Sequence, residues 1–424
     1  MKRYMCFVIV LVMALSMCSC ENMDQINVTR QTTNARISLS WWGNEVRSDY
    51  TLRSIDKFEE KNDITVTPRY CEFAGYKGWM DSKLNAGELP DVMQMNYNWL
   101  YEYTKQGVEF YDLYELKDTI KLNNFSPDQL KFGEVDGKLM GIPISLNCCY
   151  FFYNTNVLHK YNIAVPKTWE ELISAGQELK KHGVYAAEMG EKGIWLCCVA
   201  YTEQKTGKPM FDKKGNFQYG AQECKELLEF YKRFMESGIT PRPQDFNHMD
   251  FYSGRAAGLF CWISDTKSYF GANIGVNAES VNISIGDLPY ISDDNKAGWY
   301  KKPMALYCIS KDTKEPENSA KLVDHLLNDE ENAALQGTEK GIPLSRSAQE
   351  VLAARDMMSE LQAVANRKMN GDVFIDVMSP VLENEQLMKD FYAAGDDVTY
   401  NNADALKKGE EFSRAAAKAN ENAK

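Results

Sequence analysis

Two segments of alternating hydrophobicity enclose an amphipathic pattern near the start of the chain, and this arrangement limits the fold more than any other feature. Residues 36–41 alternate between polar and apolar side chains, which is typical of a strand with one buried face. Leu52, Ile55 and Phe58 then recur at helical spacing, and a second alternation at 64–67 follows. A strand, a helix and a strand joined by short links predict a βαβ unit with parallel strands.

Further elements of both kinds follow along the chain. Residues 76–84 suit a helix and residues 89–95 suit a third strand, so the first part of the chain is predicted to form an α/β lobe. Thr168 and Glu171 have the spacing of a capping box at a helix start. Residues 258–262 indicate a buried strand that ends in a polar turn.

The first twenty residues have the pattern of an export signal. Lys2 and Arg3 precede the apolar run Met5–Leu15, which is too short to span a bilayer, since a spanning helix needs about 20 residues. We therefore expect residues 1–19 to be a signal peptide and residues 20–35, which are polar, to be a flexible tether. An uncleaved membrane anchor is the alternative.

The small Ser19 before Cys20 resembles a bacterial lipoprotein box, which implies that Cys20 carries the lipid. Cys18 is the weaker candidate, because the bulky Met17 precedes it. The protein is therefore expected to be extracytoplasmic and anchored to the bacterial cell membrane through lipid.

Composition indicates a globular protein and argues against several ligand classes. With 424 residues and 44% hydrophobic residues, the chain is long enough for two or three domains. A net charge of −12 argues against nucleic acid or anionic lipid as a ligand. Only four histidines occur, and no two cysteines have C-x-x-C spacing, so neither a metal site nor a cofactor is expected. Cysteines outside the signal region are interpreted as buried core residues, with disulfides as the open alternative.

Several segments follow one another in a characteristic order along the chain, namely Ser40-Trp41-Trp42-Gly43, Gly87–Met93, Gly141–Asn154 with Pro166–Leu172, Cys261-Trp262-Ile263, and Ala320–Pro343. Together they resemble the extracellular solute-binding proteins of bacterial carbohydrate ABC importers (family 1, maltose-binding-protein-like). Each match alone is weak, and their shared order and spacing make the assignment strong.

This resemblance implies an α/β fold of the two-lobed periplasmic-binding-protein-like type (type II), with hinge-connected lobes and a helix-rich C-terminal region. Lobe 1 would comprise residues 36–146 and 302–345, and lobe 2 would comprise residues 147–301 and 346–424. A carbohydrate would be held between the lobes, which would close around it. The implied partners are ABC permease subunits with a separate ATPase, and we expect the protein itself to be a monomer.

A sugar site needs aromatic faces for the C–H surfaces of the ring and polar side chains for its hydroxyl groups. Such residues gather at predicted strand ends and crossings, where ligands of open α/β sheets bind. The candidate ligand-binding residues are Trp42, Asn44, Glu45, Arg47, Asn96, Asn98, Trp99, Asn147, Trp195, Trp262, Trp299, Tyr300 and, with Phe374, Asp372.

Other roles remain open for several of these candidates. Alternation predicts that Trp41 and Trp42 face opposite ways, although both could be core residues. Arg47 could be a solvated charge at a helix start, and Asn98 suits a helix N-cap. Trp195 and Trp299 could equally be core residues, along with others of the eight tryptophans.

The family resemblance also sets an expectation about charge. Asn98 and Trp99 stand where maltose-type proteins have an acid and an arginine, and Asn147 stands where they have a carboxylate. These differences from the maltose-type proteins indicate that the ligand is contacted by uncharged hydrogen-bonding groups and by stacked aromatic rings.

The function expected from this sequence is capture of a carbohydrate, most simply an oligosaccharide, and its delivery to an ABC permease. No sequence motif of a catalytic site is present, so an enzyme is not expected. The alternatives are the same fold with a non-carbohydrate solute such as a peptide, polyamine or anion, a surface glycan hydrolase, and an adhesion or scaffold lipoprotein.

Overall fold

The structure is a computed structural model that describes residues 35–212, 214–271, 281–358 and 360–419. The chain divides into two compact units. Unit 1 comprises Met1–Ser145 and Pro303–Met358, and unit 2 comprises Leu146–Lys302 and Ser359–Lys424. The signal peptide, the tether and Cys20 lie outside the described residues.

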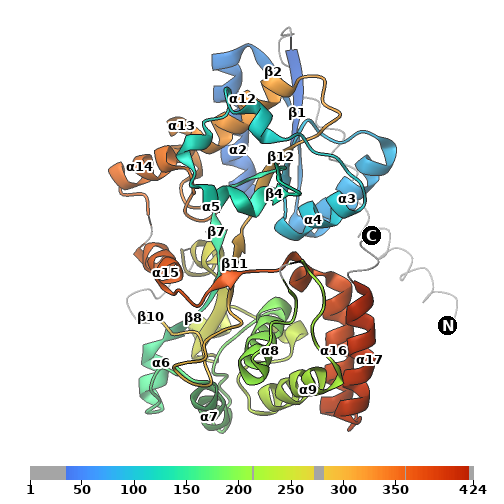
Figure 1. Cartoon of the computed structure of the whole chain (residues 1–424). Helices are drawn as coiled ribbons and strands as arrows, with labels where there is room; N and C mark the ends of the chain where they lie inside the picture. Colours follow the sequence, from blue (N-terminus) through green and yellow to red (C-terminus); the bar gives the residue numbers. More distant parts are fainter. Residues whose placement is uncertain (1–34, 213, 272–280, 359, 420–424) are drawn as a thin grey trace, which may run out of the picture. The chain divides into compact units, whose positions relative to one another are not determined.

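Unit 1 is built on a five-stranded sheet with the strand order β2-β1-β3-β12-β6 (Figure 1). Its strands, with the separate pair β4 and β5, are β1 (Ala35–Trp42), β2 (Ile64–Cys71), β3 (Val92–Met95), β4 (Glu134–Val135), β5 (Lys138–Leu139), β6 (Ile142–Pro143) and β12 (Leu306–Ile309). Its helices are α2 (Glu45–Asn62), α3 (Phe73–Ala86), α4 (Tyr97–Lys105), α5 (Pro127–Leu130), α12 (Pro316–Asn328), α13 (Glu330–Gln336) and α14 (Arg346–Ala354).

The predicted βαβ unit is confirmed. β1 and β2 pair in parallel from Ala35 opposite Ile64 to Trp42 opposite Cys71, and α2 connects them. β3 also runs parallel to β1, whereas β12 runs antiparallel to β3 and brings the chain back from unit 2. The sheet of unit 1 is therefore mixed, with a parallel half formed by consecutive βα segments.

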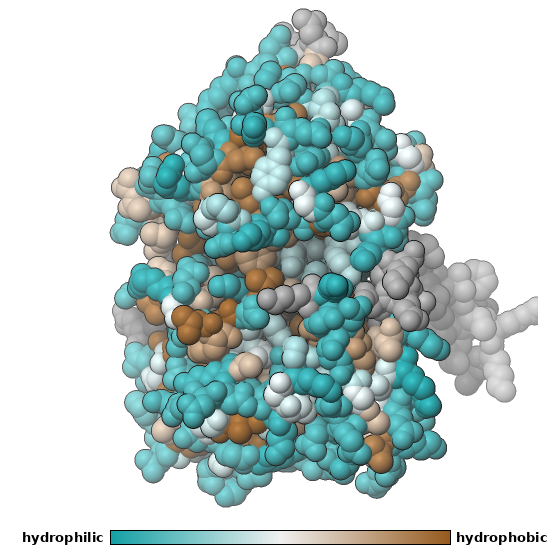
Figure 2. All heavy atoms as spheres, in the orientation of Figure 1, coloured by the Kyte–Doolittle hydropathy of each residue, from teal (hydrophilic) through white to brown (hydrophobic). Residues whose placement is uncertain are grey.

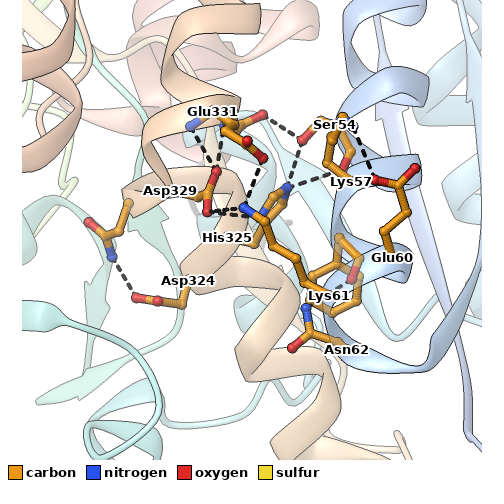
Figure 3. Close-up of polar contacts among 12 residues, drawn as sticks. Ser54, Lys57, Glu60, Lys61, Asn62, Asp324, His325, Asp329 and Glu331 are labelled. Carbon is orange, nitrogen blue, oxygen red and sulfur yellow. Dashed lines mark hydrogen bonds and ion pairs between the residues drawn. The ribbon is translucent and has the colours of Figure 1, made fainter.

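Helices cover the unit 1 sheet, and α2 is fixed against α12 and α13 by a polar cluster (Figure 3). Nε2 of the buried His325 lies 3.0 Å from the Ser54 hydroxyl, which in turn donates a hydrogen bond of 2.7 Å to Asn332. Lys61 forms ion pairs with both Asp329 (3.1 Å) and Glu331 (2.9 Å). These contacts join helices that are more than 260 residues apart in the sequence.

Unit 2 contains two three-stranded sheets, ordered β10-β8-β9 and β13-β11-β7. The strands are β7 (Leu146–Asn147), β8 (Cys149–Asn154), β9 (Gly258–Trp262), β10 (Ile283–Ile285), β11 (Tyr300–Pro303, which ends in unit 1) and β13 (Asp376–Val377). The helices are α6 (Thr155–Lys160), α7 (Trp169–Lys180), α8 (Glu191–Thr206), α9 (Ala221–Glu236), α10 (Asp250–Ser253), α15 (Glu360–Gly371), α16 (Glu385–Tyr400) and α17 (Ala405–Ala419).

The C-terminal helices α16 and α17 pack on α9, which also contacts α8, so the end of the chain completes the core of unit 2 (Figure 1). The expectation of a helix-rich C-terminal region agrees with this arrangement. Residues 346–358, which include α14, belong to unit 1, whereas the expected lobe limits assigned them to lobe 2. α14 packs against α12 and α13, which also belong to unit 1.

The cysteines outside the N-terminal region are free in the structure, and all but the half-buried Cys71 are buried. Cys197 and Cys198 lie inside α8, surrounded by the apolar core of unit 2. Burial raises the pKa of both thiols well above the ordinary value. The interpretation of these residues as small core side chains is therefore confirmed.

Charged and polar side chains cover most of the face shown in Figure 2, in keeping with a chain in which 25% of residues are charged. None of the helices in the described ranges is long and apolar enough to cross a membrane.

The capping box predicted at Thr168 is present at the start of α7. The Thr168 hydroxyl accepts a hydrogen bond from the amide of Glu171, and the Glu171 carboxylate accepts one from the amide of Thr168. Replacing Thr168 by alanine should lower the free energy of unfolding by about 1 kcal/mol, because an N-terminal amide of the helix loses its acceptor. Urea unfolding measures this change. Thr168→Ser retains the hydroxyl and should unfold close to the wild type.

Candidate ligand-binding site

Aromatic side chains gather at the carboxyl end of β1 in unit 1. The Trp42 ring lies 5.6 Å from Phe73, 5.3 Å from Tyr76 and 5.4 Å from Trp99, measured between ring centroids. Phe73 and Trp99 are stacked at 5.3 Å with an interplanar angle of 14°. Phe73 is 46% exposed, whereas Trp42 and Trp99 are 5% and 3% exposed. We call these four residues the aromatic platform, and Phe73 provides its open surface.

The alternation in β1 places the two tryptophans on opposite faces of the sheet, as predicted. Trp41 stacks on Tyr70, its neighbour in β2, at 4.7 Å and is fully buried. Trp42 faces the side of α3, where the Tyr76 hydroxyl lies 2.7 Å from that of Ser40. Phe73 was not among the residues predicted from the sequence, although an aromatic residue at the start of the helix after β2 was a usable signal.

The asparagines after β3 are buried at the start of α4. Asn96, not Asn98, is the N-cap of this helix, because the Asn96 side chain accepts a hydrogen bond from the amide of Tyr97 at 3.0 Å. The suggested N-cap role of Asn98 is therefore wrong, since helical backbone already begins at Tyr97. Asn98 instead donates a hydrogen bond to the Glu102 carboxylate at 3.1 Å.

The candidates after β1 take different positions at the start of α2. Asn44 is the N-cap, because its side chain accepts a hydrogen bond from the amide of Arg47 at 3.0 Å. Glu45 is exposed in the first turn, where a negative charge interacts favourably with the helix dipole. The half-buried Arg47 is not a freely solvated charge, because its Nη2 donates to the carbonyl oxygen of Glu339 at 2.9 Å.

In unit 2, Trp262 is the last residue of β9 and Asn147 the last residue of β7, a strand of the other sheet. Trp262 ends β9 opposite Cys149 and is partly exposed. The Asn147 side chain donates to the Ser264 hydroxyl at 2.8 Å and accepts from the Ser264 amide at 3.1 Å. The Asn147 side chain therefore contacts the turn that follows Trp262, and a ligand-binding role for either residue stays a prediction.

A buried ion cluster lies beside Trp262. Lys302 Nζ is 5.0 Å from the centre of the Trp262 ring and 2.7 Å from Glu383 Oε2. Lys192 binds the other oxygen of Glu383 at 2.6 Å. Burial alone would raise the pKa of Glu383, but the two ammonium groups outweigh burial and hold it at about 2. None of these three charged residues was predicted from the sequence.

Trp195 and Trp299 are core residues of unit 2, with 1% and 2% of their surfaces exposed. The indole of Trp195 donates to the Leu382 carbonyl at 2.8 Å, and that of Trp299 donates to the Pro289 carbonyl at 3.0 Å. Trp299 also stacks on Trp169 at 5.6 Å. Of the two roles left open, these contacts favour packing over ligand contact, because the ring faces and the N–H groups are already occupied.

Tyr300 and Asp372 each bind a partner within unit 2. The Tyr300 hydroxyl donates to Glu203 at 2.6 Å, and burial raises the pKa of Glu203 to about 7. Asp372 accepts a hydrogen bond from the Tyr150 hydroxyl at 2.9 Å and lies 3.7 Å from Lys368 Nζ. Phe374, named with Asp372, is half-buried two residues further on.

The candidate residues form no metal site and do not line the surface hollow described next. Within the described ranges, no three His, Cys, Asp or Glu side chains gather as metal ligands. A hollow of about 520 Å³ is lined by residues of α6 and by residues 162–165. It contains no tryptophan and none of the candidate residues, so it is not part of the candidate site.

Residues 53–366 match the family model of bacterial extracellular solute-binding proteins. The chain belongs to this family. Its fold is the two-lobed fold of periplasmic solute-binding proteins, and membership implies an extracytoplasmic location.

Solved structures and curated relatives agree with this assignment. A periplasmic solute-binding protein of Pectobacterium atrosepticum is 29% identical, with a TM-score of 0.85 over 92% of this chain and 99% of that chain. A periplasmic oligogalacturonide-binding protein of Yersinia enterocolitica, solved with saturated digalacturonic acid, is 27% identical, with a TM-score of 0.81 over 92% and 100%. The maltodextrin-binding protein MdxE of Bacillus subtilis is 22% identical over 72% of each chain.

Proposed function

We propose that this solute-binding protein is a lipid-anchored receptor that captures a carbohydrate, most simply an oligosaccharide, and delivers it to an ABC permease. The observation that carries the proposal is the aromatic platform at the carboxyl edge of the unit 1 sheet, where Phe73 offers a half-exposed ring face. Sugar rings stack on such faces through their C–H surfaces. The edge of an open α/β sheet at which parallel strands end is also where ligands bind.

Unit 2 contributes a second aromatic surface in this proposal. Trp262 is partly exposed, and the Asn147–Ser264 pair fixes the turn that follows it. The relatives named above are described as binding maltodextrin and oligogalacturonide, which supports an oligosaccharide as the ligand class. One of these ligands is neutral and the other is acidic, so the names of the relatives alone leave the charge of the ligand open.

The proposal is of a binding protein, not of an enzyme. Glu203 has a raised pKa, but its carboxylate is engaged by the Tyr300 hydroxyl and by the amide of Met210. A glycosidase needs two carboxylates facing one glycosidic bond. Lipid attachment at Cys20, the permease and the monomeric state remain part of the proposal.

A glycan panel read by thermal shift and tryptophan fluorescence tests this function. We expect at least one oligosaccharide to raise the melting temperature and change the fluorescence, without release of free sugar over several hours. A panel of peptides, polyamines and inorganic anions is the control. Stabilisation by one of these and by no glycan would contradict the proposal, and turnover of a glycan would indicate a hydrolase.

A further inference from the structure

A group of polar side chains is buried in unit 1 around a lysine that pairs with no carboxylate among the described residues. Lys340 is fully buried, and its ammonium donates a hydrogen bond of 2.9 Å to the Tyr307 hydroxyl. The Tyr50 ring of α2 lies 5.8 Å from the same ammonium. Gln94 of β3 stands directly opposite Tyr307 of β12, so both side chains leave the same face of the sheet. We call Lys340, Tyr307, Tyr50, Gln94 and Arg47 the Lys340 cluster.

Several polar atoms of this cluster have no hydrogen-bond partner in the part of the chain that the structure describes. They are the Tyr50 hydroxyl, both side-chain heteroatoms of Gln94 and Nε of Arg47, all of which are buried. About 90% or more of buried polar groups in proteins are paired. Several unsatisfied groups around one buried ammonium are therefore unusual, and most of them are hydrogen-bond donors. A donor-rich environment of this kind suits an anionic ligand group.

Arg47 extends the cluster from the buried lysine to the surface. Its Nη2 binds the carbonyl oxygen of Glu339, the residue before Lys340, and its side chain is only half-buried. Gly43 makes room for this side chain, since a Cβ at residue 43 would lie 2.7 Å from Arg47 Cβ. Arg47 lies in the first turn of α2, shortly after Trp42, which is the last residue of β1 and a member of the aromatic platform.

The two cations are not neutralised by the described part of the chain. Within it, neither Arg47 nor Lys340 forms an ion pair with a carboxylate. The buried lysine of unit 2 behaves differently, because Lys302 is paired with Glu383 at 2.7 Å. Buried charges in proteins are normally paired. Arg47 and Lys340 together therefore have the features of a site whose negative charge is supplied by the ligand.

We propose that Arg47, supported by Lys340, binds the carboxylate of a sugar acid, so that the carbohydrate captured is a uronic acid-containing oligosaccharide. This inference rests on the proposed function and specifies its substrate class. The planar guanidinium of Arg47 can hold a carboxylate through two parallel hydrogen bonds. Lys340, behind it, contributes positive charge in a region of low dielectric constant, where that charge acts strongly.

The ionisation of Lys340 provides a signature of this arrangement. Burial, and secondly the charge of Arg47, lower the pKa of Lys340 to about 7. The other titratable groups around it are the Tyr50 and Tyr307 hydroxyls, whose pKa values are raised by burial, and Glu339 in the same turn. An anion bound nearby favours the charged ammonium. Uronate binding should therefore take up protons, and its affinity should fall as the pH rises from 7 to 9.

Calorimetry with digalacturonate and its dimethyl ester tests the inference, because the two probes differ only in their carboxylates. At pH 7.5 we expect digalacturonate to bind at least tenfold more tightly than the ester. Arg47→Gln should weaken digalacturonate binding at least tenfold and ester binding less than twofold. Arg53→Gln is the matched control, since it removes an exposed arginine of the same helix that is paired with Asp49, and it should change neither affinity.

Titrations in two buffers of different ionisation enthalpy measure the protons taken up. The wild type should take up a fraction of a proton per digalacturonate, and Lys340→Met, which keeps a long apolar side chain, should take up none. Should Lys340→Met fail to fold, the Arg47→Gln variant and the pH dependence of the wild type still test whether this site binds the carboxylate.

Three outcomes would overturn the inference. Equal affinity for acid and ester, or tighter binding of a neutral oligosaccharide, would exclude carboxylate recognition while leaving the proposed function intact. Preference for the acid with unchanged affinity in Arg47→Gln would exclude this site. Binding of no glycan at all would remove the proposed function together with the inference.

Discussion

Replacing Glu383 by glutamine is expected to lower the free energy of unfolding by roughly 3–5 kcal/mol, because it leaves the buried ammonium of Lys302 without a counter-charge. Glutamine keeps the shape of the side chain, so the loss reports on charge and not on a cavity. Chemical unfolding followed by circular dichroism measures it. Glu385→Gln, an exposed carboxylate two residues later, is the matched control and should cost less than about 1 kcal/mol.

The pH dependence of unfolding provides an independent check on the same cluster. The pKa of Glu383 is about 2 in the folded protein and 4.5 without its neighbours, so its contribution is complete above about pH 4.5. As the pH falls from 4.5 towards 2, the unfolded chain takes up a proton that the folded chain does not, and this stability is lost. Glu383→Gln should lack this component. An acid unfolding curve parallel to that of the wild type would contradict the assignment.

Removing both buried charges should be less harmful than removing one. In Lys302→Met/Glu383→Met the desolvation cost of both groups disappears with their attraction. Lys192 also loses Glu383, but its side chain is 35% exposed and can be solvated, so part of the lost stability should return. A double variant as unstable as Glu383→Gln would mean that packing, not charge, explains the effect.

Replacing Trp262 by alanine is expected to weaken carbohydrate binding tens-fold or more, since a desolvated aromatic contact contributes roughly 1–3 kcal/mol to binding. Trp262 is the candidate of unit 2 that combines partial exposure with a fixed neighbouring turn. Calorimetry with the oligosaccharide found in the glycan panel measures the change. Trp262→Phe keeps an aromatic face and should lose much less affinity.

Lys302 lies over the indole ring of Trp262, so the folding of the Trp262→Ala protein must be checked by circular dichroism. A matched variant elsewhere in unit 2 serves as the control for affinity. Tyr400→Ala removes an exposed aromatic side chain from α16 in the same unit and should leave the affinity unchanged. Unchanged affinity in a correctly folded Trp262→Ala protein would exclude Trp262 from the site.

The local elements of this fold were predictable because short-range patterns determine them. The alternation at 36–41 gave β1, the helical spacing from Leu52 to Phe58 gave α2, and the Thr168–Glu171 spacing gave the capping box of α7. Each of these signals is contained in a segment of a few residues, so it can be recognised without knowing the tertiary contacts. Tertiary contacts reinforce them and do not override them.

The candidate site was less predictable, because ligand-binding roles depend on contacts between distant residues. Alternation separated Trp41 from Trp42, but only α3 and α4 determine how much of Trp42 is covered. Lys302 and Glu383 are 81 residues apart, so no local pattern reveals their pairing. Lys340 stands in a polar turn where a solvated lysine is the ordinary expectation, yet it is fully buried against Tyr307.

A crystal structure of the protein with its oligosaccharide bound would show which side chains hold the sugar. We expect a sugar ring packed on Phe73 or on Trp262, with hydroxyl groups hydrogen-bonded to polar side chains around these rings. A saccharide bound elsewhere, with both aromatic surfaces free of ligand, would contradict it.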